Sequence, residues 1–391
     1  MSVETITLGC RLNFAESSTI ARLAAPEDDW VVVNSCAVTN EAIRQTRQAI
    51  RRAHRERPTS KIVVTGCAAE LDPHSFQAMP EVERVIGNAG KLTDLVGAGR
   101  SPERPLVPAG AYARVRSFVA VQTGCDHRCT FCSIWQARGA SISLPFEAIR
   151  DAIADELDRG VREIVLTGVD ITSYEGGIGP LCQKLLAAEP RLQRLRLSSL
   201  DSIELDETLF ALIAGEPRLM PHFHLSLQSG DDMILKRMKR RHSRADAIQM
   251  IARIKAARPD ASIGADLIAG FPTETEQMAL NSLMLIDDCE IVAAHIFPFS
   301  PRPNTPAARM PQLDRETVKA RAARMREAAA SRRSAWLKSL VGTTGTVLIE
   351  NQSKGHSDGF APVHVEGSRR GDVGRARFTR VDDDQLVGAW A

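Results

Sequence analysis

The chain has 391 residues, of which 43% are hydrophobic and 25% are charged, with a formal net charge of +2. This ordinary balance excludes a disordered or collagen-like chain, and the length predicts two or three domains. The start has no secretory signal pattern, and no stretch approaches the ~18 apolar residues of a membrane span, so we expect a soluble cytoplasmic protein without membrane contacts. Eight cysteines are few for a disulfide scaffold of this size, and spaced cysteines in a reducing compartment indicate metal binding or catalysis.

Residues 1–95 are predicted to form a parallel α/β sheet. Three β-branched runs, Thr5–Cys10, Trp30–Cys36 and Lys61–Cys67, each end in a cysteine, and helical patterns over Glu16–Leu23 and Glu41–Glu56 separate them. Parallel strands share one carboxyl edge, where ligand sites of open α/β sheets lie. We therefore expect the three cysteines to converge.

A second α/β region is expected over residues 112–340, because the Gly- and Pro-rich segment from Gly87 to Arg116 predicts a loop and a domain boundary. Its predicted strands are Ser117–Gln122, Arg162–Asp170, Arg194–Ser199, His222–Ser229, Ser262–Phe271 and Ala294–Phe299. Helical patterns separate most of them, which predicts a partial (β/α)6 or full barrel with its active site at the carboxyl ends of the strands.

The end of the chain predicts a helix and a small β-module. The proline-rich segment Pro298–Pro306 ends the barrel, and Asp314 can cap a helix that reaches about Leu340. Residues 342–391 then contain short alternating runs separated by Gly-containing turns, which predict a small all-β domain. Those runs are Thr346–Glu350, Ala361–Glu366, Ala376–Val381 and Gln385–Trp390.

The sharpest motif is Cys125-x3-Cys129-x2-Cys132 at the end of the first predicted barrel strand. Three thiolates this close can hold three irons of a cubane cluster and leave the fourth iron open. A structural zinc site, which needs four protein ligands and would recruit His127, is one alternative. Three unrelated core cysteines are the other.

The other five cysteines divide into two groups. Cys10, Cys36 and Cys67 share a strand-end position, so they match a second cluster with one open iron, although burial in the core is the alternative interpretation. Cys182 and Cys289 have helical or strand-edge contexts and no thiol companions. We interpret these two as core residues.

Five other residues are candidates for cofactor binding. Gly168 and Asp170 follow a strand, where backbone can approach a ligand and a carboxylate can accept from an ammonium group; a surface turn is the alternative. Ser198 and Gln228 fall at strand ends, where they can hold a ribose or a carboxylate or be ordinary hydrogen-bonded polar groups. Asp266 lies in an apolar strand, so its carboxylate needs a partner, which can be structural or a substrate.

Basic residues are clustered although the net charge is small. Six arginines lie between Glu41 and Arg57, and six lysines or arginines lie between Lys236 and Arg244. The predicted helix from Arg315 carries more. Such patches can bind phosphates, while the alternative is a solvated helical face. The acidic and basic residues of the final β-module nearly balance.

The cysteine motif, with Phe131 before its last cysteine, resembles the radical S-adenosylmethionine (SAM) superfamily. The additional triad before it makes the chain similar to the methylthiotransferases of that superfamily. Further matching blocks are Val165–Tyr174, Leu195–Ser199, His224–Gly230, Ala265–Glu274 and Phe297–Ala307. The first block, together with Asp231–Arg241, resembles the branch that modifies N6-threonylcarbamoyladenosine beside the tRNA anticodon.

The resemblance implies two 4Fe-4S clusters, a radical-generating one on Cys125, Cys129 and Cys132 and a sulfur-carrying one on Cys10, Cys36 and Cys67. SAM would be both methyl donor and radical source, with contacts from Gly168, Asp170, Ser198, Gln228 and Asp266. It further implies the tRNA anticodon stem-loop, an electron donor such as flavodoxin or ferredoxin, and a sulfur source as partners. The last module occupies the place of the RNA-binding TRAM domain.

Three substrates or roles compete with this expectation. The same chemistry can act on isopentenyladenosine of tRNA or on an aspartate of a ribosomal protein, and a non-catalytic metal-containing RNA-binding protein is the alternative from another class. The sequence also departs from the family pattern. Ser133–Arg138 replaces an Ile-Pro-aromatic segment, the path from Leu23 to Trp30 is abbreviated, and the last module is short.

Overall fold

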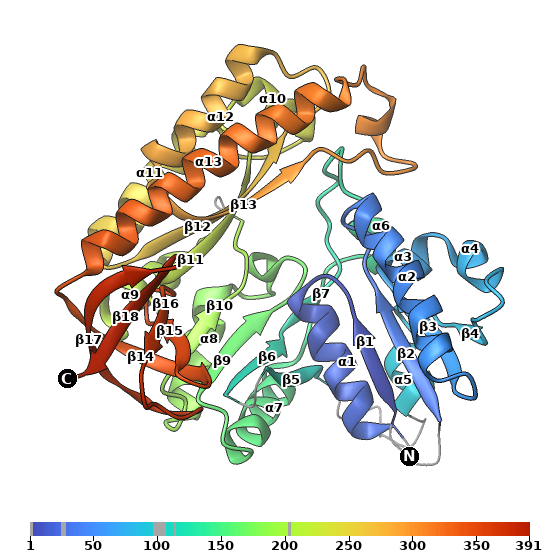
Figure 1. The fold of residues 1–391 in the computed structure, drawn as a ribbon, viewed down its shortest axis with the longest axis horizontal. Helices are drawn as coiled ribbons and strands as arrows, with labels where there is room; N and C mark the ends of the chain where they lie inside the picture. Colours follow the sequence, from blue (N-terminus) through green and yellow to red (C-terminus); the bar gives the residue numbers. More distant parts are fainter. Residues whose placement is uncertain (1–2, 25–28, 97–106, 113–114, 202–204) are drawn as a thin grey trace.

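Three units lie along the chain in the computed structural model, which describes residues 3–24, 29–96, 107–112, 115–201 and 205–391. Figure 1 shows an N-terminal sheet domain in blue, a central α/β unit, and a small red β-barrel at the C-terminus, on the far side of the central unit from the blue domain. This arrangement confirms the predicted fold class. None of the helices in the described ranges has the length and apolar character needed to cross a membrane.

The N-terminal domain is a parallel sheet with strand order β1-β2-β3-β4. These strands are Glu4–Thr7, Trp30–Ser35, Lys61–Gly66 and Arg84–Val85. Its helices are α1 (Arg11–Leu23), α2 (Asn40–Glu56), α3 (Cys67–Leu71) and α4 (Pro73–Gln77). Alternate strand residues, such as Val32 and Val33, pack into separate apolar clusters on the two faces of the sheet, as expected for a parallel sheet. The three predicted strands are confirmed, and they end one to three residues before their cysteines.

The segment predicted as a loop contains regular structure. A helix, α5 (Lys91–Val96), and an edge strand, β5 (Ala109–Tyr112), fall within it, and its residues 97–106 and 113–114 lie outside the described ranges. Strand β5 pairs antiparallel with the first barrel strand, and the Thr19 hydroxyl on α1 donates to the Ala109 carbonyl at 3.1 Å. The loop prediction was wrong here because pairing with a neighbour overrides the low strand propensity of Ala-Gly-Ala.

The central unit is a partial barrel of parallel strands. Its two sheets have the orders β10-β9-β6-β5 and β11-β12-β13, and the bridge between Leu200 and Leu225 joins them. The parallel strands are β6 (Arg116–Ala120), β9 (Glu163–Thr167), β10 (Leu195–Leu197), β11 (His222–Gln228), β12 (Ser262–Ala269) and β13 (Ile291–Pro298). The six predicted strands are therefore confirmed, most with shorter ends. A short hairpin, β7 (Gln122–Thr123) with β8 (Ile142–Ser143), follows β6.

Helices cover the outside of the partial barrel. They are α7 (Phe146–Asp158), α8 (Ile178–Ala188), α9 (Glu207–Gly215), α10 (Asp232–Met238), α11 (Arg244–Ala257) and α12 (Glu276–Asp288). Helix α6 (Ile134–Arg138) instead packs against the N-terminal domain, where Ile134 and Ala137 join an apolar cluster. Alternate strand residues such as Ile164 and Leu225 pack against these helices in the largest apolar core. Cys182 and Cys289 are fully buried in the same core, which confirms their interpretation as core residues.

The opposite faces of the strands are polar. Successive strand residues point to opposite faces, so the residues between the outward apolar ones point into the barrel. They include Glu163, Arg196, His222, His224 and Asp266. An ordinary α/β barrel fills its interior with branched apolar residues. This interior, which we call the central chamber, is instead lined by groups that can bind a polar ligand.

The C-terminal part confirms the capped helix and extends the β-module. Helix α13 (Arg315–Leu340) starts after Asp314, whose carboxylate accepts from the Thr317 backbone N–H at 2.8 Å. Five strands then close a barrel in the order β14-β15-β16-β18-β17. They are Thr344–Asn351, Lys354–Ser357, Pro362–Val365, Val373–Asp382 and Gln385–Trp390. Strand β15 was not predicted, since Lys-Gly-His-Ser has low strand propensity; a Cβ at Gly355 would collide with the Leu348 carbonyl.

The β-module closes the floor of the central chamber. Phe360 lies between two imidazoles, with ring centroids 5.0 Å from His222 and 4.4 Å from His356. The guanidinium groups of Arg116 and Arg196 lie 5.0 and 4.9 Å from the same ring. The ring and the two cations thus seal the end of the barrel at which its strands begin.

A buried ion cluster holds this floor together. Glu163 is fully buried and accepts from Arg116, Arg194 and Arg196. Burial alone raises the pKa of Glu163, but the three guanidinium groups outweigh it and hold that pKa well below the usual range. Arg116 also donates to Glu350 of the β-module at 2.7 Å. The two barrels therefore share one charge network.

Candidate active site

The N-terminal triad, which consists of Cys10, Cys36 and Cys67, lies at the carboxyl edge of the first sheet. Strands β1, β2 and β3 are paired in register, so their ends bring the three residues to one edge. Cys36 and Cys67 are buried. Burial, together with the charges of Cys10 and Cys67, raises the pKa of Cys36 to about 11. The convergence predicted from the sequence is confirmed.

Two glycines allow the strands to turn into this triad. Gly9 and Gly66 have φ angles of +92° and +91°, which residues with a side chain rarely adopt. A Cβ at Gly9 would lie 2.6 Å from the Cys36 sulfur, and a Cβ at Gly66 would collide with the Ser35 carbonyl. The thiols are therefore held in a close-fitting cradle.

The motif triad, which consists of Cys125, Cys129 and Cys132, lies on the loop between β7 and α6. The loop is anchored at Thr130, whose hydroxyl donates to the Arg237 carbonyl at 2.8 Å. The Cys132 sulfur accepts from the Ile134 backbone N–H at 3.3 Å. Burial raises the pKa of Cys125 to about 12 and that of Cys132 to about 11.

The two triads approach each other across the domain boundary. The charge of Cys67 acts on Cys132. Arg138, which ends the helix after the motif triad, donates from Nε to the Cys67 sulfur at 3.3 Å and from Nη1 to Glu16 at 2.6 Å. Lys91 also donates to Glu16. A buried salt-bridge network thus joins α1, α5 and α6 beside both sets of thiols.

Arginines are the functional residues that sequence reasoning missed. Besides Arg138, Arg240 lies with its guanidinium 3.8 Å from the Cys129 sulfur and donates to Asp201 at 2.8 Å. The charge of Arg302 acts on Cys36, and its guanidinium donates to the Ala37 carbonyl at 3.0 Å. All three lie in segments described in the sequence analysis. Arg138 is in the segment that differs from the family pattern, Arg240 is in a basic cluster, and Arg302 is in the proline-rich segment. Their pairing with thiols required the fold.

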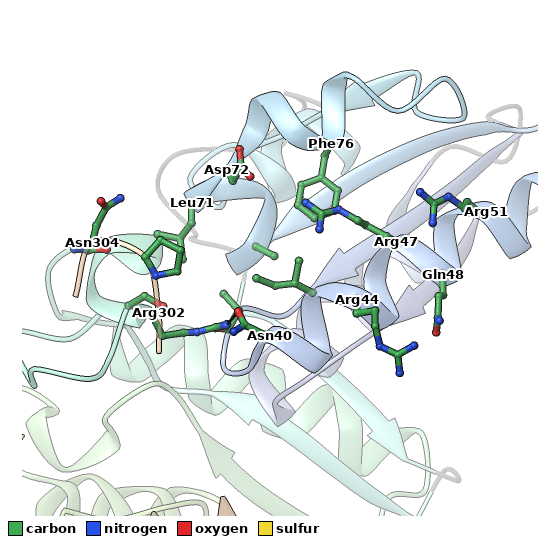
Figure 2. Close-up of a pocket in the computed structure, with 16 residues that line it drawn as sticks. Asn40, Arg44, Arg47, Gln48, Arg51, Leu71, Asp72, Phe76, Arg302 and Asn304 are labelled. Atoms are coloured by element: carbon green, nitrogen blue, oxygen red, sulfur yellow. Dashed lines mark hydrogen bonds between the residues drawn. The ribbon is translucent and has the colours of Figure 1, made fainter. Parts of the chain in front are cut away.

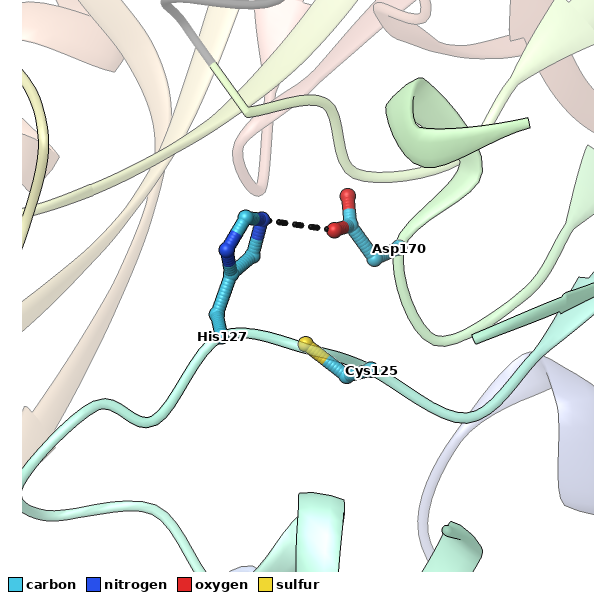
Figure 3. Close-up of side chains that lie close together, drawn as sticks. All are labelled: Cys125, His127 and Asp170. Carbon is cyan, nitrogen blue, oxygen red and sulfur yellow. Dashed lines mark ion pairs between the residues drawn. The ribbon is translucent and has the colours of Figure 1, made fainter. Parts of the chain in front are cut away.

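The donor chemistry of both triads fits iron-sulfur clusters. Each triad offers three free thiols, and a neighbouring guanidinium can offset the negative charge that thiolates and reduced clusters carry. The zinc alternative would need His127 beside all three thiols, but its ring contacts Asp170 at 2.8 Å and lies with Asp170 and Cys125 (Figure 3). Among the described residues, Cys129 and Cys132 take no part in that group, although the group itself could hold a metal ion.

Asp170 and Gly168 occupy the carboxyl end of β9. Asp170 accepts from Thr172 at 2.8 Å and from Ser173, besides its contact with His127. Burial opposes ionisation, but these hydrogen bonds outweigh it and lower the pKa of Asp170 to about 2. Gly168 packs against Gln122, since a Cβ there would lie 2.8 Å from the Gln122 carbonyl oxygen. Asp170 is therefore a charged group beside Cys125, whereas Gly168 permits close backbone packing.

Asp266 lies deeper in the chamber than the other candidates. Its Oδ1 contacts Nε2 of His224 at 2.9 Å and Nδ1 of His295 at 3.0 Å, so the partner expected for this carboxylate is a pair of histidines. Ser198 instead directly follows β10, and Gln228 is the last residue of β11. Gln228 has a φ of +67°, so the backbone turns at this strand end.

An arginine-lined groove opens beside both triads. It has a volume of about 650 Å³ and lies between α2, α3, α6 and the segment after β13. Figure 2 shows Arg44, Arg47 and Arg51 along α2, with Arg302 across from them. Other lining residues directly follow cysteines of both triads: Ala37, Ala68 and Ser133. The basic cluster predicted on the second helix thus forms one wall of a groove that reaches the thiol sites.

Comparison with known families agrees with this geometry. The Radical SAM superfamily matches residues 119–286, and the uncharacterized protein family UPF0004 matches residues 2–87. The solved structure of the radical S-adenosylmethionine methyltransferase TsrM from Kitasatospora setae is similar, with a TM-score of 0.55 and 14% identity. The match covers 75% of this chain and 66% of that chain and shows a shared fold.

Closer relatives are known from sequence. The threonylcarbamoyladenosine tRNA methylthiotransferase MtaB of Rickettsia prowazekii is 41% identical over 93% of this chain and 91% of its own. The protein of the same name from Thermotoga maritima is 32% identical over 100% and 97%. The tRNA-2-methylthio-N(6)-dimethylallyladenosine synthase of Paracoccus denitrificans is 32% identical over 98% and 96%. Since these matches run through both cysteine triads, the chain belongs to the radical SAM methylthiotransferase family.

Proposed function

We propose that this enzyme methylthiolates C2 of N6-threonylcarbamoyladenosine next to the tRNA anticodon. Two 4Fe-4S clusters and SAM, as methyl donor and radical source, are its proposed cofactors. The observation that carries the proposal is the approach of two open thiol triads, with Arg138, on the helix that follows one triad, contacting Cys67 of the other. Relatives at 41% and 32% identity whose name states this nucleoside support the choice of substrate.

The two cysteine triads have different proposed roles. Cys125, Cys129 and Cys132 would hold the cluster that SAM completes, and the N-terminal triad would hold the second cluster. When bound, these groups supply the electron, the radical that abstracts hydrogen, and the sulfur and methyl that are transferred. The protein holds the adenosine between the triads and keeps water away, for which the chamber with its sealed floor is suited.

Isopentenyladenosine in tRNA is the second candidate substrate, because relatives named for the dimethylallyl product are as similar as the second MtaB relative, at 32% identity. None of the three relatives described above is named for the ribosomal aspartate. Membership in the radical SAM methylthiotransferase family argues against the non-catalytic alternative. An electron donor such as flavodoxin or ferredoxin and a sulfur source complete the proposed set of partners.

A nucleoside profile separates these substrates. Transfer RNA from a deletion strain is digested and analysed by mass spectrometry, with the complemented strain as control. Loss of the methylthio form of threonylcarbamoyladenosine alone supports the proposal. Loss of the methylthio form of isopentenyladenosine would assign the second candidate, and an unchanged profile would reject tRNA as the substrate.

Replacement of single cysteines tests the two cluster roles. Cys129→Ala is expected to abolish deoxyadenosine formation from SAM, because the open iron site needs all three thiolates. Cys36→Ala is expected to retain deoxyadenosine formation and to lose methylthiolation. Cys182→Ala, which removes a buried thiol outside both triads, is the matched control. Methylthiolated product from the Cys36→Ala enzyme would contradict the role of the N-terminal triad.

A further inference from the structure

One guanidinium faces the central chamber from the N-terminal domain. Arg11 is the first residue of α1 and directly follows Cys10. Its guanidinium carbon lies 5.8 Å from the ring centroid of Phe118 on β6, and that ring packs edge-on against Phe14 at 5.5 Å. Phe118 is an inward residue of its strand, so the cation is half-buried at the open side of the barrel.

Arg11 differs from the other arginines around the chamber in having no acceptor. Arg116, Arg194 and Arg196 share Glu163, and Arg240 is paired with Asp201. Within the described ranges, the guanidinium of Arg11 takes part in no hydrogen bond or ion pair, and it lies over the Phe118 ring. A half-buried cation beside an aromatic ring loses hydration and gains no hydrogen-bond acceptor, so a ligand that brings an anion would be stabilised there.

The nearby carboxylate is already engaged. Among the charges that act on Arg11 is that of Asp266, but the Asp266 oxygen is shared by His224 and His295, whose ring centroids lie 4.7 Å apart. In the neutral tautomer that donates from Nδ1 to this carboxylate, Nε2 of His295 is a hydrogen-bond acceptor. The side chain of His295 is 60% exposed, so this nitrogen is accessible to a ligand.

We propose that Arg11 binds the carboxylate of the threonylcarbamoyl group, and that Nε2 of His295 accepts from an N–H or hydroxyl of the same substituent. The inference rests on the proposed function and adds the residues that select the substituent. Guanidinium and carboxylate match in shape and form paired hydrogen bonds. Because Arg11 follows Cys10, a carboxylate held there keeps the modified adenosine beside the N-terminal triad.

The same arrangement disfavours isopentenyladenosine. Its N6 substituent is apolar, so its entry into the chamber would cover the Arg11 cation and leave it unpaired. A site built to hydrogen-bond a polar group discriminates strongly against an analogue that lacks that group. Arg11 is therefore assigned as a specificity residue that contacts the substrate.

The test compares three anticodon stem-loops with the reconstituted holoenzyme. They carry threonylcarbamoyladenosine, its methyl ester, or isopentenyladenosine. The wild type is expected to prefer the acid over the ester by roughly 10- to 100-fold in kcat/KM, the range for one hydrogen-bonded charge pair. Arg11→Gln is expected to reduce this preference to about one by losing activity on the acid only. Arg11→Lys should recover part of it, since lysine keeps the charge without the paired geometry.

Binding and cofactor content provide independent measurements. Dissociation constants of the same stem-loops, from fluorescence anisotropy, are expected to follow the same order. Arg253→Gln, on the outer helix α11, removes an arginine away from the chamber and should retain the wild-type preference. Iron and sulfide counts of the Arg11→Gln enzyme show whether both clusters are retained. If they are lost, the acid-to-ester ratio of the wild type alone still tests the carboxylate contact.

The outcomes separate this inference from the proposed function. Equal kcat/KM for acid and ester in the wild type, or an acid preference that persists in Arg11→Gln, would overturn the role of Arg11 while leaving threonylcarbamoyladenosine as the substrate. Product from the isopentenyl stem-loop alone would overturn the proposed function itself. A preference for the acid that Arg11→Gln abolishes and Arg11→Lys partly restores supports both.

Discussion

Arg138 shows how one side chain can serve two thiol sites. It ends α6, the helix that follows the motif triad, contacts the Cys67 sulfur at 3.3 Å, and is held by Glu16. Burial by itself lowers the pKa of Arg138, but the charges of Glu16, Cys67 and Cys10 outweigh burial and raise that pKa well above its usual value. The guanidinium therefore remains a fixed positive charge beside the N-terminal triad.

Removal of this charge has a measurable consequence. Arg138→Gln is expected to weaken retention of the cluster on the N-terminal triad by roughly 10- to 100-fold, as is usual when a partner of a metal ligand is lost. It should also make the reduction potential more negative, because the extra electron is no longer offset by the cation. Iron counting and potentiometric titration followed by electron paramagnetic resonance, both in a Cys129→Ala background, measure the two effects.

Arg138→Lys is the matched control, since it keeps the positive charge at this position. It should retain most of the iron and a potential near that of the parent. If Arg138→Gln had the same iron content and potential as the parent, the guanidinium would have no electrostatic role at the triad.

At the scale of single residues, the sequence predicted the candidate cysteines better than the side chains that contact them. The six cysteines could be found because strand ends and the C-x3-C-x2-C spacing are local patterns. Arg138, Arg240 and Arg11 could not, because an arginine has many possible neighbours and only the tertiary fold selects one. The partner of Asp266 could be expected, since a carboxylate in an apolar strand needs one, but its identity as two histidines could not.

Among the elements, α2 carries five arginines against two glutamates. Its Arg44, Arg47 and Arg51 lie three and four residues apart and line one groove. Arg47 lies 5.4 Å from the Phe76 ring centroid and donates to the Ser75 hydroxyl at 3.1 Å, which orients it along the groove wall. Such a row of cations suits the phosphates of an RNA strand.

Simultaneous replacement of these three arginines by glutamine is expected to weaken tRNA binding and its salt dependence. Each lost phosphate contact lowers the magnitude of the slope of log K against log salt by about 0.7 to 0.9. The slope of the triple variant should therefore be smaller in magnitude by about 2 to 3. Filter binding at several salt concentrations measures the slope. Arg52, Arg253 and Arg324 are exposed but do not line the groove, so their replacement is the control. An equal loss in both variants would mean that total charge, rather than this groove, binds the RNA.

Strong local patterns explain which elements were predicted. The β-branched strands were found from their residue pattern, and helix α13 was found because Asp314 is a capping residue at its start. Strands β5 and β15 were missed because Ala-Gly-Ala and Lys-Gly-His-Ser are poor strand formers that pair only with a neighbour in place. In both, a glycine permits a close approach, of Ser18 on α1 in one case and of the Leu348 carbonyl in the other.

At the scale of the whole molecule, the three units meet around one chamber. The N-terminal domain contributes Arg11 at its side, the central strands contribute the wall, and Phe360 of the β-module seals its floor. The sequence did not predict this floor, because Arg116, Glu163, Arg196 and Phe360 are far apart in the chain and no local pattern pairs them. The sequence shows that these residues alternate with apolar ones. Only the curvature of the sheet, however, brings their side chains together.

The floor should respond to pH through His222. Burial lowers the pKa of His222 well below its usual value, and Arg196 lowers it further. The folded protein therefore keeps this ring neutral where the unfolded chain binds a proton, so stability decreases as pH falls below about 6.5. The loss approaches about 1.4 kcal/mol per pH unit for one group.

The measurement is the thermal midpoint of the anaerobic holoenzyme between pH 7.5 and 5.5. His222→Gln retains a polar side chain that can contact Ser262, the present partner of the ring at 2.8 Å, and removes the titration. The midpoint of this variant should fall less steeply with decreasing pH than that of the wild type. Parallel curves would show that protonation of His222 does not act on the folded state.

The position of Phe360 in the chain also affects how the enzyme is made. All six cysteines of the two triads precede it by more than two hundred residues, so a nascent chain exposes every one of these thiols long before the ring that closes the floor leaves the ribosome. A product that stops short of the β-module would possess both triads and yet leave Glu163 and its arginines open to water. Completion of the chain, rather than presence of the cysteines, therefore sets the earliest moment at which reactive chemistry can be enclosed.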